Sequence, residues 1–373
     1  MNVPKIRFKV FHDEWQSKKL KDITEINTGR SKLTNNNNGQ YAILGSTGII
    51  RYSNNFDYEG NFILIARVGA HVGNIYCFNG KVKISDNTIF IKSKNVEFLS
   101  NYLKRFDLKK LSFGTGQPLI KSSDLKKIKI LLPSCFEQQQ IGAFFSKLDA
   151  LISAQSKKLT LLKQLKHGYL QRMFPQADQT IPRVRFKGFN DKWQSKKIEN
   201  VVSITMGQSP SSENYTDNNN DYILIQGNAD IKNHKIIPRV WTTQITKIAS
   251  NNDIIMTVRA PVGEVSILNY PKAVIGRGVA SLTIKSNNSL LFVYYLLMKL
   301  NISNYWHKCS AGSTFENINS NDIKNARLLF TSFEEQQQIG SLFAKLDYLI
   351  ELQNHKLALL QQLKKGYLQK MFC

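Results

Sequence analysis

The sequence predicts an α+β protein in which two mixed α/β domains are separated by two long helices that form an antiparallel intramolecular coiled coil. Three observations carry this prediction: a helix-like segment that occurs twice, a second segment that opens each half, and two dissimilar inserts between these repeats. The expected boundaries are 1–135 for the first mixed domain, 136–174 for the first helix, 175–333 for the second mixed domain and 334–373 for the second helix.

The helical repeat runs from Glu137 to Phe174 and returns, without a gap, from Glu335 to Phe372, an offset of 198 positions. Apolar residues recur at spacings of three, four or seven, and no proline interrupts the first copy before Pro175. This is the pattern of a long amphipathic helix. At 1.5 Å per residue, the part from Ile141 to Met173 would form a rod of about 50 Å.

The apolar positions of the two copies predict a seam between the helices. Its members are Ile141, Phe145, Leu148, Ile152, Leu159, Leu162, Ile339, Phe343, Leu346, Ile350, Leu357 and Leu360. Two matching stripes in one chain can bury each other, and an antiparallel pair would place the two mixed domains at opposite ends. A surface helix packed on its own domain is the alternative, which the duplication disfavours. Gln155 and Gln353 share one seam position, where a polar residue fixes helix register or marks a solvated end.

The second repeat opens each half, with the segment from Val3 matching the segment from Ile181 at an offset of 178. Between the repeats, residues 21–110 and 199–308 are dissimilar. Runs rich in Ile, Val, Phe and Tyr predict strands at Tyr41–Leu44, Phe62–Ala66, Thr88–Ile91, Tyr222–Gln226, Ile254–Val258 and Val279–Ile284. Helical segments are expected at Val96–Leu111 and Leu290–Tyr305. Each half is therefore predicted to be a mixed α/β domain.

Charge indicates a polyanionic partner, because 51 Lys and Arg against 27 Asp and Glu leave a net charge of +24. A membrane is disfavoured, since the longest apolar run, Leu290–Met298, is too short to span one. The N-terminal residues contain no apolar core typical of a secretory signal. The four cysteines lie far apart and are expected to be reduced thiols of a cytoplasmic protein. Nucleic acid is the partner that these observations favour, with an acidic protein as the alternative. Double-stranded DNA is the nucleic acid expected from the loops and the resemblance described below.

Loops between the predicted elements carry side chains suited to base edges. Arg can donate two hydrogen bonds to guanine, and Asn or Gln can exchange two with adenine. Taken singly, each is more often a solvated surface residue, but loops of different content at matching places are what two readers of different sequences would need. The DNA-binding candidates are Arg30, Ser31, Lys32, Arg67, His71, Asn74, Gln117, Lys121, Gln208, Ser209, Ser211, Gln226, Asn228, Arg259, Ser313, Asn317 and Asn319.

Catalytic motifs are not found in the sequence. No Pro-Pro pair is present, so the loop of adenine methyltransferases is missing, and Gly80-Lys81 lacks the rest of a phosphate-binding loop. His71 has no second ligand at metal-binding spacing. We therefore predict no catalytic residue, no metal site and no cofactor in this chain.

The order of variable domain, EQQQIG helix, variable domain and EQQQIG helix closely resembles the specificity subunits of type I restriction-modification systems. The resemblance covers essentially the whole chain and is strongest at Glu137–Gly142, Glu335–Gly340 and the segments leading into Trp15 and Trp193. It implies two target-recognition domains, each reading one half of an asymmetric DNA site, with the helices setting the unread spacer.

The resemblance also implies partners in phage defence. Two methyltransferase subunits would dock on the helices and bind S-adenosylmethionine, and two restriction subunits would use ATP and Mg to translocate and cleave DNA. This chain would direct those activities in the prokaryotic cytoplasm, associated with the nucleoid through DNA, and would catalyse none of them. The base-contacting residues cannot be carried over, because recognition domains of this family diverge widely.

Two other functions remain open from the sequence. A stand-alone coiled-coil DNA-binding regulator would bind specifically without enzyme partners, and a pull-down from the native host would then recover no methyltransferase. A fused restriction enzyme with unrecognisable motifs would methylate DNA when the purified chain is given labelled S-adenosylmethionine.

Overall fold

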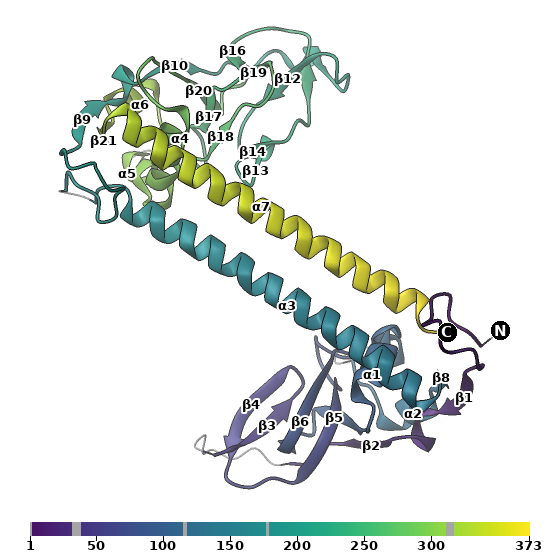
Figure 1. The fold of residues 1–373 in the computed structure, drawn as a ribbon. Helices are drawn as coiled ribbons and strands as arrows, with labels where there is room; N and C mark the ends of the chain where they lie inside the picture. Colours follow the sequence, from purple (N-terminus) through teal and green to yellow (C-terminus); the bar gives the residue numbers. More distant parts are fainter. Residues whose placement is uncertain (1, 32–38, 115–117, 177–178, 311–316) are drawn as a thin grey trace. The chain divides into compact units, whose positions relative to one another are not determined.

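The computed structural model describes residues 2–31, 39–114, 118–176, 179–310 and 317–373. The chain forms two compact units (Figure 1). Unit 1 comprises Met1–Lys157 and Asn354–Cys373, and unit 2 comprises Lys158–Gln353. Each unit therefore combines one sheet-rich domain with part of both long helices, and the predicted α+β class with two mixed domains and long helices is confirmed.

Unit 1 is built on a six-stranded sheet with the strand order β2-β7-β5-β6-β3-β4. All neighbours in it are antiparallel except β3 and β6. The strands are β2 (Glu25–Thr28), β3 (Tyr41–Gly45), β4 (Gly48–Ser53), β5 (Tyr58–Ala66), β6 (Ile75–Ile84) and β7 (Thr88–Lys92), and a separate pair joins β1 (Gln16–Lys19) to β8 (Lys129–Leu132). The helices are η1 (Leu20–Asp22), α1 (Val96–Lys104), η2 (Leu108–Leu111), α2 (Ser122–Lys127) and the long α3 (Cys135–Arg172).

The continuous apolar run at the end of β5 is explained by burial on both faces of the sheet. Ile63 and Ile65 join a core cluster with α1 and the start of α3, whereas Phe62 and Leu64 join a second cluster on the opposite face. Successive strand residues point to opposite faces, so a run without alternation marks a strand covered on both sides.

Unit 2 contains two larger sheets, ordered β10-β20-β17-β18 and β11-β15-β12-β19-β16. Their strands are β10 (Val202–Met206), β11 (Tyr215–Thr216), β12 (Tyr222–Ile225), β15 (Trp241–Thr242), β16 (Ile248–Ser250), β17 (Ile254–Thr257), β18 (Val265–Ile267), β19 (Lys272–Ile275) and β20 (Val279–Ile284). Two small pairs join β13 (Ile231–Lys232) to β14 (Lys235–Ile236) and β9 (Gln194–Lys197) to β21 (Arg327–Phe330). The helices are η3 (Ile198–Asn200), η4 (Ser212–Asn214), η5 (Asn228–Asp230), α4 (Leu290–Ile302), α5 (Tyr305–Ser310), α6 (Ser320–Asn325) and the long α7 (Phe333–Lys370).

The two helical segments expected in the inserts are shorter than predicted. The first ends with α1 at Lys104 and resumes as the short η2, and the second breaks between α4 and α5. At the second break Asn304 adopts a positive φ of 56°, a conformation outside the right-handed helix. Helical periodicity continues across such a break because the residues on both sides face the same core.

The repeated EQQQIG motif fixes the start of each long helix to its own domain. Glu137 forms a two-bonded ion pair with Arg7, and Glu335 forms the same pair with Arg185, with Nε–Oε1 distances of 2.7 Å in both. The following glutamine accepts a hydrogen bond in each unit, Gln138 from Asn95 Nδ2 at 2.8 Å and Gln336 from the backbone of Ser289 at 3.0 Å. The same ion pair therefore joins the opening repeat to the helical repeat in each unit.

Each unit also holds the end of a long helix against its opening repeat. In unit 1 the backbone N–H of Ile6 donates to Lys370 O at 2.9 Å, and Trp15 packs edge-on against Phe372. In unit 2 the N–H of Val184 donates to Arg172 O at 3.0 Å, and Trp193 packs edge-on against Phe174. Unit 1 thus takes its helix end from α7, and unit 2 takes its helix end from α3.

Within each unit, α3 and α7 run antiparallel. In unit 1, Phe144 contacts Tyr367 and Asp149 pairs with Lys364. In unit 2, Phe174 stacks on Phe343 and Lys166 pairs with Asp347 at 2.6 Å. In both units the residue number falls along one helix as it rises along the other. Each unit therefore contains its own antiparallel pair of helix segments.

The predicted seam residues differ in burial along the helices. Ile141, Phe145, Leu148, Leu159, Ile339, Phe343 and Leu346 are buried, whereas Ile152, Leu162, Ile350, Leu357 and Leu360 are half-buried. Ile141 and Phe145 belong to the domain core of unit 1 together with Trp15 and Phe98, so they do more than line a helix pair. Gln353 is buried, which argues against a solvated end at that position.

Candidate nucleic-acid interface

In unit 1, three turns of the mixed α/β domain are joined by backbone hydrogen bonds. In the loop after β2, the backbone N–H of Gly29 donates to Thr88 O and that of Ser31 donates to Ile84 O, both at 2.9 Å. The loop after β5 donates from Arg67 to Asn87 O at 3.0 Å. The turn between β6 and β7 thus lies between the loops that carry Arg30 and Arg67.

A fourth segment of unit 1, which leads into α2, pairs with the β5 loop. Val68 and Leu119 form an antiparallel bridge, and the N–H of Ile120 donates to Arg67 O at 2.9 Å. The predicted loops TGRSK, ARVGAHVGN and GTGQPLIK are therefore brought together where the structure describes them.

Unit 2 repeats most of this scaffold, but the bond that Ser31 donates to Ile84 O has its counterpart one residue earlier, from Gln208 to Ile275 O at 2.8 Å. Gly207 donates to Val279 O at 3.0 Å and Val258 donates to Gly278 O at 2.9 Å. Ile318 donates to Val258 O at 3.0 Å, and Arg259 bridges Asn317. Gln226 and Gly227 join this group because the N–H of Gly276 donates to Ile225 O at 2.8 Å. The four segments predicted in the second half are thus also clustered, as far as their residues are described.

A glycine is required at the equivalent position in both clusters. A Cβ at Gly29 would lie 2.2 Å from Ser85 O, and a Cβ at Gly207 would lie 2.1 Å from Gly276 O. Such distances exclude any side chain. The two glycines therefore occupy equivalent positions, and Arg30 and Gln208 each follow one of them directly. Val68 and Arg259 are counterparts because each forms the matching isolated bridge.

The described candidates fall into two groups by exposure. Ten are exposed at the surface: Arg30, His71, Asn74, Lys121, Gln208, Ser211, Asn228, Arg259, Asn317 and Asn319. Arg67, Ser209 and Gln226 are half-buried and Ser31 is buried. Lys32, Gln117 and Ser313 lie outside the described residues.

Several candidates use their polar groups in hydrogen bonds within the protein. Ser31 accepts from the N–H of Ile84 at 3.0 Å and donates to Asp57. Arg67 Nη1 donates to Asp86 O at 3.1 Å, and Gln226 Nε2 donates to the Tyr215 hydroxyl at 2.6 Å.

Asn319 and Lys121 also make contacts within the protein. The side chain of Asn319 accepts two backbone N–H bonds at the start of α6, so this residue is a helix cap. Lys121 Nζ lies 4.4 Å from the Phe113 ring centroid. Sequence patterns select polar loop residues but cannot separate such structural roles from free ones.

The sequence analysis missed the central turn of each cluster. These turns are Ser85–Asn87 in unit 1 and Gly276–Gly278 in unit 2, and their middle residues, Asp86 and Arg277, are exposed. The Gly-Arg-Gly sequence was the available signal, since glycine flanking a basic residue permits close backbone approach.

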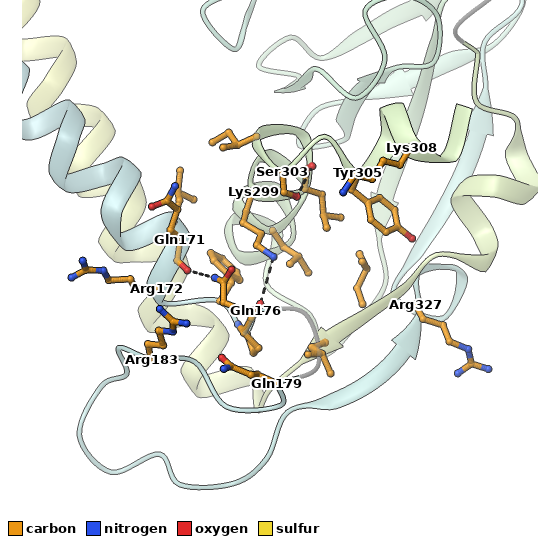
Figure 2. Close-up of a pocket in the computed structure, with 18 residues that line it drawn as sticks. Gln171, Arg172, Gln176, Gln179, Arg183, Lys299, Ser303, Tyr305, Lys308 and Arg327 are labelled. Carbon is orange, nitrogen blue, oxygen red and sulfur yellow. Dashed lines mark hydrogen bonds between the residues drawn. The ribbon is translucent and has the colours of Figure 1, made fainter. Parts of the chain in front are cut away.

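Unit 2 also has a basic cavity of about 730 Å³, bounded by the end of α3, the segment after it, α4, α5 and β21 (Figure 2). Five cationic residues line it and no carboxylate does: Arg172, Arg183, Lys299, Lys308 and Arg327. Burial lowers the pKa of Lys299, whose Nζ donates to Pro175 O at 3.4 Å. Arg105 makes the matching bond to Cys373 O at 2.5 Å in unit 1. The five cations give the cavity the charge to accept an anion. Lys299, however, already donates to the backbone of the segment that follows α3.

None of the described helices combines the length and apolar character needed to cross a bilayer. Among the described side chains, no group of three or more His, Cys, Asp or Glu is placed to bind a metal ion.

Comparisons with known proteins identify the family. A family model for the type I restriction modification DNA specificity domain matches residues 12–164 and 190–362. The putative type I restriction enzyme MjaX specificity subunit of Methanocaldococcus jannaschii is 27% identical, over 95% of this chain and 91% of that protein.

Solved structures agree in fold. The type I restriction-modification S subunit of M. genitalium superposes with a TM-score of 0.70 at 16% identity, covering 100% of this chain and 99% of that one. A structure from work on complex assembly and conformational transition of the type I restriction-modification system has a TM-score of 0.57 at 22% identity, covering 96% and 97%. The family model matches both halves of the sequence, and the chain belongs to the DNA specificity subunits of type I restriction-modification systems.

Proposed function

We propose that the loop cluster of each unit reads one half of a bipartite DNA site, and that the long helices set the unread spacer and dock the catalytic subunits. The observation that supports this proposal is that the two loop clusters share a backbone scaffold but expose different side chains. Arg30 in unit 1 and Gln208 in unit 2 each follow the equivalent glycine, and Arg259 stands where unit 1 has Val68. Arg favours guanine and Gln favours adenine, so the two clusters would select different sequences.

The matched pair Arg30 and Gln208 tests this division of labour. The chain would be co-expressed with the methyltransferase subunit from its own operon, and methylated sites mapped by single-molecule sequencing. Arg30→Ala should relax one half-site and Gln208→Ala the other, each by roughly 1–3 kcal/mol of discrimination at one base. Lys18→Ala, which removes an exposed charge from β1, should leave both half-sites intact. Loss of both half-sites in either single variant would contradict the proposal.

The excess positive charge is expected to supply sequence-independent affinity. Lys and Arg contacts to phosphates release condensed counterions, so binding should weaken steeply with salt. This contribution positions the protein on the duplex, while base contacts select the site.

Exposed leucines on the long helices are the docking surface that we propose for the methyltransferase subunits. Unit 1 exposes Leu151, Leu359 and Leu363 at 48–51%, and unit 2 exposes the repeat-equivalent Leu349, Leu161 and Leu165 at 43–54%. Exposed apolar side chains at repeated positions suit a protein interface. The duplication fits two copies of one partner, and the restriction subunits would join the complex that results.

Charging this surface should impair assembly. Leu161→Lys and its counterpart Leu359→Lys should each weaken binding of the methyltransferase subunit about tenfold or more, since a buried leucine contributes about 1.5–3 kcal/mol. Analytical ultracentrifugation of the mixed subunits measures this. Ile49→Lys, on β4 and exposed to a similar 49%, is the matched control and should assemble normally. Unchanged assembly of both leucine variants would place the interface elsewhere.

S-adenosylmethionine, ATP and Mg would be bound by the partner subunits in this proposal. The purified chain should therefore transfer no methyl group to DNA, and methylation by the chain alone would refute its non-catalytic role.

A further inference from the structure

The turn between β19 and β20 presents one exposed cation at the centre of the unit 2 loop cluster. Arg277 is exposed, while Gly276 and Gly278 on either side of it are buried. The N–H of Arg277 donates to Ser209 Oγ at 3.2 Å, and the N–H of Val279 donates back to Gly276 O at 3.1 Å. The turn is thus closed on itself and tied to the loop that carries Gln208.

The backbone under Arg277 is held from three directions. A Cβ at Gly278 would lie 2.1 Å from Gln226 O, so only glycine allows this approach. Gly276 donates to Ile225 O at 2.8 Å, and Gly278 accepts from Val258 at 2.9 Å. The loops that carry Gln208, Gln226 and Arg259 therefore all contact this turn. A side chain projecting from so constrained a backbone loses less freedom on binding than one on an isolated loop.

The surroundings leave the Arg277 guanidinium available to a ligand. Within the described part of the chain, no carboxylate lies within ion-pairing distance of it. The counterpart position in unit 1 is Asp86, as the matching bonds from Arg67 to Asn87 O and from Val258 to Gly278 O show. One scaffold position thus carries opposite charges in the two units. A position that served phosphate binding in both units would be expected to keep its positive charge.

We propose that Arg277 is a specificity-determining residue that reads a guanine in the half-site recognised by unit 2. Its guanidinium donates two parallel hydrogen bonds to guanine O6 and N7 in the major groove. Gln208, Asn228 and Arg259 lie in the adjoining loops and contact neighbouring positions. This assignment rests on the proposed function of the loop clusters.

The test maps methylated sites for the complete complex carrying Arg277→Ala or Arg277→Gln. Arg277→Ala should reduce discrimination for guanine at one position roughly ten- to hundredfold, and Arg277→Gln should shift that position toward adenine. The half-site read by unit 1 stays unchanged and serves as the internal reference. Lys272→Ala removes another exposed cation from β19 and should leave the motif intact. Thermal unfolding of each variant should match the parent, because Arg277 is exposed.

Three outcomes would overturn the assignment. An unchanged motif in both Arg277 variants means that the side chain does not select a base. An unchanged motif with weaker binding and a smaller salt dependence assigns Arg277 to a phosphate. If the unaltered complex methylates no bipartite site at all, the proposed function fails and this assignment fails with it, whereas a bipartite motif insensitive to Arg277 overturns the assignment alone.

Discussion

Inserting four residues after Gln155 and four after Gln353 should lengthen the unread spacer by about two base pairs and leave both recognised half-sequences unchanged. Four helical residues add about 6 Å, and one base pair of B-DNA occupies about 3.4 Å. The insertion also turns the helix by about 40° beyond a full rotation, because an α-helix has 3.6 residues per turn. Single-molecule methylome sequencing reads both half-sites and the gap between them.

The antiparallel contacts explain why the insertion should be made in both helices. Asp149 pairs with Lys364 in unit 1, and Lys166 pairs with Asp347 in unit 2. Both insertions fall between these pairs, so each unit keeps its own contacts. An insertion after Gln155 alone shifts one domain as well, but it leaves the helices unequal in length and should lower stability. Altered half-sites with an unchanged gap would refute the role of the helices as a spacer.

Removing the carboxylate of Glu137 should destabilise unit 1 by about 3–5 kcal/mol, the usual effect of leaving one partner of a buried ion pair uncompensated. The side chain of Glu137 is 1% exposed and that of Arg7 is 10% exposed. The hydrogen bond from Arg7 to Glu137 raises the pKa of Arg7. Without Glu137 this contribution is lost, but the guanidinium stays charged because arginine is not deprotonated in proteins. Hydrogen exchange of each unit measures the change in Glu137→Ala, with the intact Arg185–Glu335 pair of unit 2 as the reference.

An exposed ion pair is the control that shows how much stability changes when a glutamate outside a buried pair is removed. Lys197 and Glu199 pair at 3.2 Å with side chains 37% and 40% exposed, so Glu199→Ala should change stability by less than about 1 kcal/mol. Replacing both buried partners, as Arg7→Met with Glu137→Leu, should recover most of the loss. A small effect of Glu137→Ala would show that apolar packing alone fixes the helix start.

Elements with strong periodicity were predictable from the sequence, and those fixed by tertiary contacts were not. The long helices and the strands at Phe62–Ala66 and Val279–Ile284 follow from apolar patterns. The longest strand of unit 1, β6 (Ile75–Ile84), was missed because Asn79-Gly80 in its middle has the composition of a turn. Its pairing with β5 and β3 overrides that local preference.

The sequence identified the candidate loops, but neither their clustering nor their individual roles. The structure joins TGRSK and ARVGAHVGN through backbone bonds to the turn between β6 and β7. The capping role of Asn319 and the internal bond of Arg67 depend on the positions of α6 and Asp86, which no local pattern encodes. Which of the exposed side chains touch bases stays a prediction.

The exchange of helix ends means that the two halves of the sequence are not self-sufficient. Residues 1–157 bury Trp15 and Phe98 against Phe372, which follows the end of α7 in the second half. Trp193 and Phe292 are buried in turn against Phe174, which is contributed by the first half. A half expressed alone would expose the aromatic side chains that these phenylalanines cover. Because each half supplies a phenylalanine to the core of the other, the folding of each domain depends on the presence of the other half. A half expressed alone would need a second chain to supply the phenylalanine that it lacks.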